Sequence, residues 1–174
     1  MTLLDRLFRD VRAAAAAELA LVLPLLLIIM FGAFEIGNYF LDEHILVKGV
    51  RDGARFAARQ NFSNYSACSG AVGNPVLSDT RNVVKTGLVS GGTDRLPYWA
   101  ATTISVTMTC TTTAGGQTMG GIYTGNKNSA GALIGAPIVT VSATVPYTPV
   151  LRSFGFRGVG LNLNASEQAA VMGI

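Results

Sequence analysis

The sequence predicts an α+β fold in which a long N-terminal transmembrane helix continues into a small head built on an antiparallel sheet. A charge-free apolar run at residues 19–34 predicts the helix, and three later stretches rich in β-branched residues predict the strands. With 174 residues, the chain is long enough for one modest domain beside a separate helix. The predicted parts are a basic leader at 1–13, a transmembrane helix at 14–41, its continuation at 42–62 and an α+β head at 63–174.

The apolar segment is long enough to cross a membrane. With the small residues before it and the apolar residues after it, the run exceeds twenty residues and is interrupted only by Glu18 and Glu35. About 20 helical residues, each rising 1.5 Å, cross the hydrocarbon core of a bilayer. Pro24 removes one backbone hydrogen bond inside the run, which a membrane helix tolerates.

Charged residues on the two sides of this segment predict its orientation. Arg6, Arg9 and Arg12 precede the segment, and Asp42 and Glu43 follow it. Because positive residues stay on the cytoplasmic side, we expect a cytoplasmic N-terminus and a periplasmic head. The alternative is a cleaved secretory signal, but the alanines that would mimic its cleavage site precede the apolar run instead of following it.

The helix is expected to continue beyond the membrane segment as far as "QNFSN", because no proline interrupts it. Apolar or small residues also recur there at helical spacing: Leu46, Val50, Ala54, Ala57 and Ala58.

A second face of this helix is basic. Lys48, Arg51, Arg55 and Arg59 recur every three or four residues. Either this face is simply solvated, or it contacts lipid phosphate or the acidic residues that follow the membrane segment of a neighbouring subunit. These four residues are therefore the candidates for subunit or lipid contact.

The head is predicted to contain one short helix and several strands. The helix is "DTRNVVKTGLVSGG", with Asp79 as its N-cap and Gly91 and Gly92 at its end. The strands are "WAATTISVTMTCTT", "IVTVSATVPYTPV" and "GVGLNLNASEQAAVM". Residues 63–78 are predicted to form a loop, and the glycine-rich residues 113–137 a hairpin connection or an exposed loop.

The only two cysteines, Cys68 and Cys110, both follow the membrane segment. An even pair in an exported domain indicates a disulfide, and two buried free thiols are the alternative. A bridge would close a loop of about forty residues. The chain-entropy relation predicts that closing such a loop stabilises the folded state by about 4 kcal/mol.

The residue content argues against catalysis, metal binding and nucleic-acid binding. His44 is the only histidine and there is no Cys-x-x-Cys spacing, so neither a zinc site nor a Ser-His-Asp or Cys-His set can be assembled. The net charge is only +3 and arginines are sparse after residue 59, which argues against a nucleic-acid partner. We expect no enzymatic activity, no metal and no cofactor.

The stretch "RAAAAAELALVLPLLLIIMFGAFEIG" resembles the N-terminal signature of the TadE-like minor pilins, or pseudopilins, of bacterial tight-adherence (Flp, type IVb-like) pilus systems. The similarity continues through "GARFAARQ" and returns in "VTVSATVPYTPVL", so it covers residues 12–60 in detail and the remainder in architecture. The resemblance implies a pilin-like head and a non-catalytic role in pilus assembly, for surface adhesion or biofilm formation. It also implies the bacterial inner membrane or a cell-surface pilus as location, and other pilins, pilus-assembly membrane proteins, prepilin peptidase and lipid as partners.

The resemblance further implies roles for three residues. In the wider pilin class, prepilin peptidase cuts before the apolar helix and leaves a glutamate as the fifth residue. This rule places the cut between Ala13 and Ala14, with Ala13 standing where the class usually has glycine. Glu18 would meet the N-terminal amine of a neighbouring subunit during assembly; the alternatives are an arginine of a retained leader or headgroup water. Glu35, near the periplasmic boundary, is expected to be solvated.

A function of a different class is a membrane-tethered periplasmic domain that binds the envelope or acts as an adhesin without entering a pilus. Its ligand would contact the glycine-rich residues 113–137. Neighbouring genes for a prepilin peptidase, a secretion ATPase or a Flp pilin would favour the pilus role.

Overall fold

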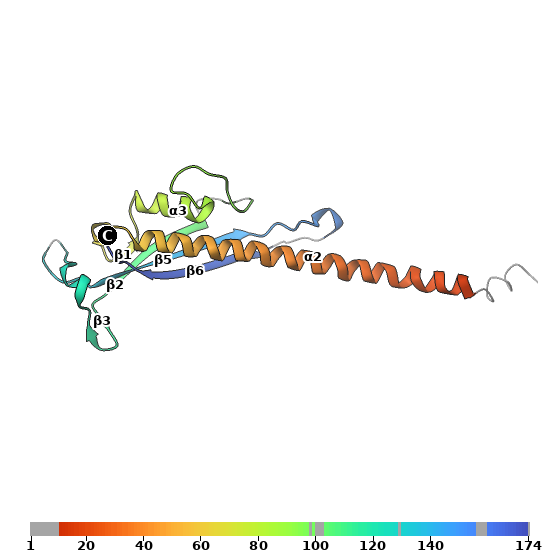
Figure 1. The fold of residues 1–174 in the computed structure, drawn as a ribbon, viewed down its shortest axis with the longest axis horizontal. Helices are drawn as coiled ribbons and strands as arrows, with labels where there is room; N and C mark the ends of the chain where they lie inside the picture. Colours follow the sequence, from red (N-terminus) through yellow and green to blue (C-terminus); the bar gives the residue numbers. More distant parts are fainter. Residues whose placement is uncertain (1–10, 98, 100–102, 129, 156–159, 174) are drawn as a thin grey trace, which may run out of the picture. The chain divides into compact units, whose positions relative to one another are not determined.

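The computed structural model describes residues 11–97, 99, 103–128, 130–155 and 160–173, without the side chains of residues 11–13 and 154. A long apolar N-terminal helix and a second helix pack against a four-stranded antiparallel sheet (Figure 1). This architecture confirms the predicted α+β class. Contacts divide the chain into two compact units, Met1–Phe40 with Thr148–Arg157, and Leu41–Tyr147 with Gly158–Ile174.

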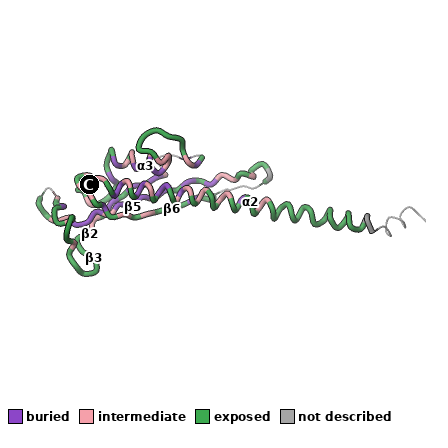
Figure 2. Tube along the Cα trace, in the orientation of Figure 1, coloured by how far each residue is buried: buried purple, intermediate pink, exposed green. Residues whose placement is uncertain are grey.

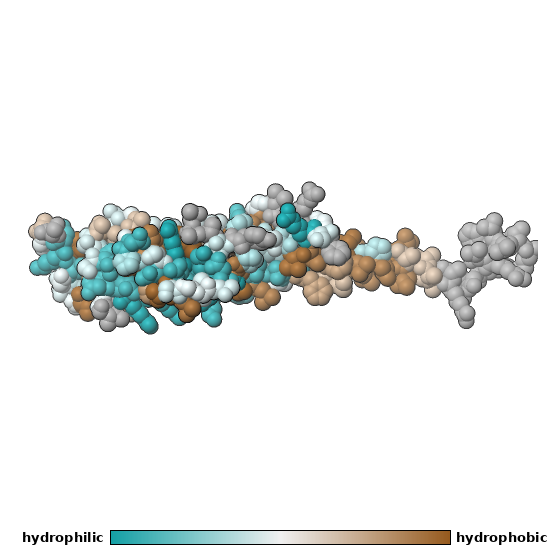
Figure 3. Space-filling model, turned by 90° about the horizontal axis from the view of Figure 1, so that it is seen from above, coloured by the Kyte–Doolittle hydropathy of each residue, from teal (hydrophilic) through white to brown (hydrophobic). Residues whose placement is uncertain are grey.

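The long helix, α2, spans Val11–Ala58 and includes Pro24. Its first half consists mainly of alanine and leucine, which are strong helix formers. The surface of that half is exposed (Figure 2) and hydrophobic (Figure 3). The helix therefore presents apolar side chains on all sides of its N-terminal part.

The end of α2 comes four residues earlier than the predicted residue 62, because the next turn is capped separately. The Asn61 side chain accepts the N–H of Ser63 at 2.9 Å and starts a 3-10 helix, η1, at Phe62–Tyr65. The buried Tyr65 hydroxyl donates to the Ala57 carbonyl, which satisfies one of the last carbonyl groups of α2. Burial also raises the pKa of Tyr65 to about 12, so the hydroxyl keeps its proton.

The main sheet has the strand order β1-β2-β5-β6, with every pair antiparallel. Its strands are β1 (Ser69–Ala71), β2 (Ile104–Thr111), β5 (Ala136–Pro146) and β6 (Asn162–Ala170). The last three lie within the predicted strand stretches or extend them by two residues, whereas β1 lies in the predicted loop. The glycine-rich region contains a small hairpin of β3 (Thr113–Ala114) and β4 (Gln117–Thr118), followed by a 3-10 helix, η3 (Gly121–Gly125).

The core lies between the sheet and the two helices. Alternate residues of β2 and β5 are buried, as expected for a sheet with one covered face. The five apolar or small residues that recur at helical spacing in α2 are at most 4% exposed and belong to this core: Leu46, Val50, Ala54, Ala57 and Ala58. The buried residues in Figure 2 gather along these elements.

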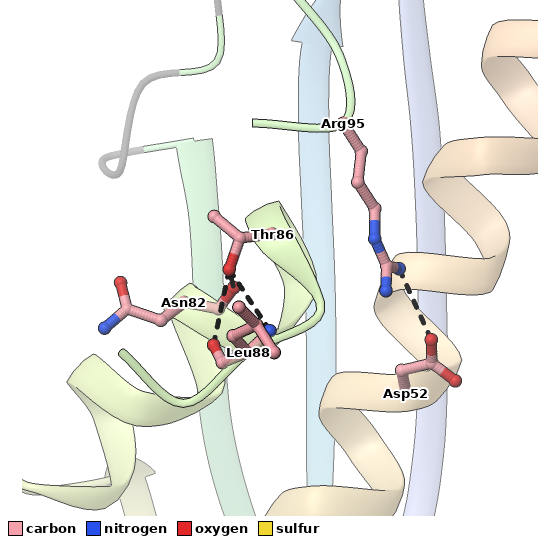
Figure 4. Close-up of polar contacts among 5 residues, drawn as sticks. All are labelled: Asp52, Asn82, Thr86, Leu88 and Arg95. Carbon is pink, nitrogen blue, oxygen red and sulfur yellow. Dashed lines mark hydrogen bonds and ion pairs between the residues drawn. The ribbon is translucent and has the colours of Figure 1, made fainter. Parts of the chain in front are cut away.

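The second helix, α3, spans Val76–Thr86, so the predicted start and end are both wrong. The helix begins earlier because the Pro75 carbonyl already accepts the N–H of Asp79, which places Asp79 in the first turn instead of at the N-cap. The helix ends earlier because Gly87 adopts a φ of 84° and donates its N–H to Val83. The Thr86 hydroxyl then accepts the N–H of Leu88 at 3.2 Å (Figure 4), which fixes the exit of the chain.

The segment after α3 is attached to both helices. The Arg95 N–H donates to the Lys85 carbonyl at 2.9 Å, and the Arg95 guanidinium lies 3.3 Å from the Asp52 carboxylate on α2 (Figure 4). Lys85 also pairs with Asp94 at 3.4 Å. Because these ion pairs are partly exposed, they position the segment more than they stabilise it.

The helices α2 and α3 approach closely at two glycines. A Cβ atom on Gly49 would lie 2.6 Å from the Val84 carbonyl oxygen, and one on Gly53 would lie within van der Waals overlap of the Val84 side chain. Only hydrogen atoms fit at these positions. These two glycines of α2 therefore form a close contact inside the chain, against α3.

Cys68 and Cys110 form a disulfide. This bond confirms the predicted bridge and rules out the alternative of two free thiols. Strand pairing explains the contact, because Ser69 of β1 lies opposite Thr109 of β2. In an antiparallel pair the preceding residue of one strand faces the following residue of the other, which brings the two cysteines together.

We expect Cys68 and Cys110 to resist alkylation in the unreduced protein and to react after reduction and unfolding. The Cys68→Ala/Cys110→Ala double variant should lose stability, by about 4 kcal/mol in the chain-entropy limit. Mass spectrometry of the alkylated protein and denaturant titration measure the two effects. Alkylation of both thiols without reductant would contradict the bridge.

The substitution Gly49→Ala should destabilise the head, because the new Cβ meets backbone that cannot move without disturbing α3. Overpacking costs about 1–3 kcal/mol, against a helix-propensity gain of about 1 kcal/mol. Gly37→Ala in the same helix is the matched control, since no atom lies within 4 Å of the position that its new methyl group would occupy. Thermal unfolding followed by circular dichroism should show a lower midpoint for Gly49→Ala only; equal midpoints would contradict the close approach.

Candidate membrane and assembly surface

The N-terminal part of α2 is an exposed apolar surface. All residues from 14 to 30 are exposed, including Leu21 at 80% and Ile28 at 65%. In the described part of the chain, α2 is the one helix long and apolar enough to cross a membrane. An apolar surface of this length requires cover by lipid or by other protein. Membrane anchoring and a signal sequence both account for such a helix near the N-terminus.

Glu18 lies near the beginning of this surface and is exposed. No described side chain pairs with it. The leader arginines, its alternative partners, lie outside the residues whose side chains are described. Ala13 and Ala14, the predicted processing positions, both lie within α2. A carboxylate on an apolar helix is costly unless an opposite charge, a hydrogen-bond donor or water meets it. The assembly role of Glu18 and the processing of the alanines stay predictions.

Glu35, in contrast, is not solvated, so the expectation for this residue is wrong. Only 9% of its surface is exposed. One carboxylate oxygen accepts the N–H of Val150 at 3.1 Å, and the other accepts the N–H of Leu151 at 3.0 Å. These partners lie more than 100 residues further along the chain. No local sequence pattern reveals such a contact; the one available signal is the glutamate inside an apolar run.

The basic face of α2 is exposed as predicted. Lys48, Arg51, Arg55 and Arg59 are all solvent-accessible. Arg51 lies 3.8 Å from Glu167 of β6, and both side chains are about half exposed, so the pair adds little stability. Arg51 and Arg55 also line a shallow pocket between α2 and β6. At least one member of the basic face therefore has an acidic neighbour within its own chain.

The glycine-rich region is held by its own polar side chains. The buried Asn126 amide donates to the Gly135 carbonyl at 2.8 Å. The Asn128 carboxamide oxygen accepts the N–H groups of Ala130 and Ala132. These contacts close the region on itself. In the described part of the chain, no three His, Cys, Asp or Glu side chains gather in a group that would hold a metal ion.

The comparison with protein families gives one match. The family model described as "TadE-like protein" aligns with residues 13–55. No curated protein and no solved structure matches the chain significantly. The aligned region includes the exposed apolar surface, Glu18 and Glu35, and the first three residues of the basic face. Residues 13–55 therefore form a TadE-like protein family domain.

Proposed function

We propose that this chain is a non-catalytic, membrane-anchored minor pilin or pseudopilin that contributes to the assembly of a tight-adherence (Flp-type) pilus. The observation that carries the proposal is the position of the TadE-like domain. It coincides with the exposed apolar part of α2 and with the beginning of the part that packs in the head. The family associates the chain with Tad pili, and the finer assignment as a minor pilin is our inference.

The proposed mechanism is protein packing, first in the membrane and then in a filament. The apolar part of α2 provides a surface that lipid covers before assembly and that other helices cover afterwards. Neither state exposes it to water. Lipid and helix interiors are similarly apolar, so the exchange depends on packing and on polar contacts more than on the hydrophobic effect.

Glu18 supplies the polar contact in this mechanism. Its partner is the N-terminal amine of a neighbouring subunit, freed when prepilin peptidase cuts between Ala13 and Ala14. A carboxylate and an ammonium group that meet in an apolar environment hold each other, whereas either one alone is costly. The exposed position of Glu18 leaves it accessible to a neighbour.

The proposed location is the bacterial inner membrane, with a cytoplasmic leader, a periplasmic head and later incorporation in a cell-surface pilus. Other pilins and pilus-assembly membrane proteins are the partners. Lys48, Arg55 and Arg59 are exposed and would contact lipid phosphate or acidic residues of a neighbouring subunit. Surface adhesion or biofilm formation is the outcome at the level of the cell.

Replacing Glu18 tests the assembly mechanism. Glu18→Leu should preserve or improve membrane insertion, because it removes a charge whose insertion cost is about 2.5–3.5 kcal/mol at the bilayer centre and less near the edge. The same change should impair pilus production and co-purification with partner pilins, since the partner charge is then unmatched. Membrane fractionation, pilus yield and co-purification measure these outcomes.

Two further variants complete this test. Glu18→Gln keeps size and polarity and isolates the role of the charge, so it should also impair assembly. Asp79→Asn removes a carboxylate from the first turn of α3, away from the apolar run, and should change neither insertion nor assembly. If both Glu18 variants insert and support piliation like the parent, the assembly role of Glu18 is wrong. A head that binds envelope components without any co-purifying pilin would instead support the tethered-domain alternative.

The orientation is tested by a reporter that is active only in the periplasm. Fused after Ile174, it should be active, because three leader arginines precede the apolar run and two acidic residues follow it. The same reporter fused before Met1 should be inactive. The reversed pattern, in fusions that are expressed at equal levels, would overturn the proposed topology.

A further inference from the structure

The connection between β5 and β6 is longer than a hairpin needs. β5 ends at Pro146 and β6 begins at Asn162, and the Tyr147 N–H donates to the Leu161 carbonyl at 2.9 Å as one further pair of the ladder. Hairpin loops usually contain two to five residues, and long ordered connections usually have a function. We call residues 148–155 the anchoring loop.

Glu35 satisfies the backbone of the anchoring loop. Pro149 has no N–H group, and the next two N–H groups, from Val150 and Leu151, both donate to the Glu35 carboxylate. Residues 149–151 therefore have no N–H that requires water. Non-helical backbone at membrane depth is tolerated only when its polar groups are satisfied by protein, and this stretch meets that condition for its donors.

The position of Glu35 along α2 places the loop at one boundary of the bilayer. Glu35 follows Glu18 by 17 residues, and residues 19–34 between them carry no charge. At 1.5 Å per residue this separation is about 26 Å, close to the hydrocarbon thickness of about 30 Å. If Glu18 lies at the cytoplasmic boundary, Glu35 and the loop bound to it lie at the periplasmic boundary.

The side chains of the anchoring loop suit such a boundary. Val150 is 67% exposed, although its N–H is bound to a buried carboxylate, and Leu151 is partly exposed. The exposed Arg152 follows directly. On α2, Phe34 and Ile36, the sequence neighbours of Glu35, are also exposed, at 66% and 59%. At a bilayer boundary, apolar side chains lie in the acyl region, and the guanidinium of a neighbouring arginine lies at the lipid phosphates.

We propose that the anchoring loop is a second membrane contact, held against α2 by Glu35 at the periplasmic interface of the bilayer. Its partner is the lipid interface itself, with Val150 in the acyl region and Arg152 at the phosphates. The proposal rests on the proposed anchoring of α2 and goes beyond it, because it adds a segment from the head sequence to the membrane-facing surface. Glu35 is a positioning residue in this arrangement.

Spin-label accessibility in the full-length protein tests the contact. The described chain has no free cysteine, so one introduced cysteine gives one label site. Val150→Cys, Leu26→Cys and Ile122→Cys replace residues of similar exposure, at 67%, 56% and 58%, in the loop, the apolar helix and the glycine-rich region. Each variant is reconstituted in vesicles of phosphatidylethanolamine and phosphatidylglycerol and probed with oxygen, which enters lipid, and with a water-soluble nickel complex.

We expect the labels at positions 150 and 26 to be more accessible to oxygen and the label at 122 to be more accessible to nickel. If position 26 is in lipid and position 150 is in water, the loop proposal fails while the membrane helix stands. If position 26 is itself in water, the proposed anchoring fails and the loop proposal fails with it.

Glu35→Gln tests the positioning role separately. The amide keeps one acceptor oxygen and places an NH2 donor against a backbone N–H, so one of the two loop bonds is lost. In this background, the label at 150 should shift towards nickel accessibility while the label at 26 stays in lipid. Asp42→Asn, which removes one carboxylate charge seven residues further along α2, controls for the lost charge near the boundary and should leave the label at 150 in lipid. An unchanged label at 150 in Glu35→Gln would overturn the role of Glu35.

Discussion

One constraint governs this structure: a single uninterrupted helix, α2, has to satisfy two different surroundings. Residues 14–30 are exposed on every side and apolar, as lipid or neighbouring helices require. From Leu46 onwards the same helix is one-sided, with a buried face against the head and a basic face in solvent. The residue pattern changes while the helical hydrogen bonding continues, so the first core element of the head is a direct continuation of the exposed apolar helix.

Features that depend on local pattern could be read from the sequence. The one-sided face of α2 follows from apolar residues at helical spacing, and β2 and β5 follow from β-branched residues with a period of two. The disulfide follows from the number and position of the cysteines. In each case the residues that predict the element also form its buried contacts. Tertiary packing therefore favours the same structure as the local sequence.

Features that depend on distant residues could not be predicted. The partners of Glu35 lie in the β5–β6 connection, and a carboxylate in an apolar run looks the same whether water or a backbone amide meets it. β1 has three residues, one of them glycine, and exists because it pairs with β2. The helix α3 ends at its C-cap, Gly87, whereas the sequence pattern predicted its end at the later pair Gly91 and Gly92. The proposed role of Glu18 involves a second molecule, so the fold of one chain contains no contact that represents it.

The hydrogen bond from the Met172 N–H to the Ala58 carbonyl has a consequence for the order of events during biosynthesis. The ribosome makes α2 first and α3 soon afterwards, yet the sheet beneath the buried face of α2 is complete only when β2, β5 and β6 have been made. Contacts of such long sequence separation form slowly. A nascent chain would thus hold a membrane-length helix, and an incompletely covered apolar face beside it, for most of its synthesis, which is the interval in which a holdase chaperone would protect it from aggregation.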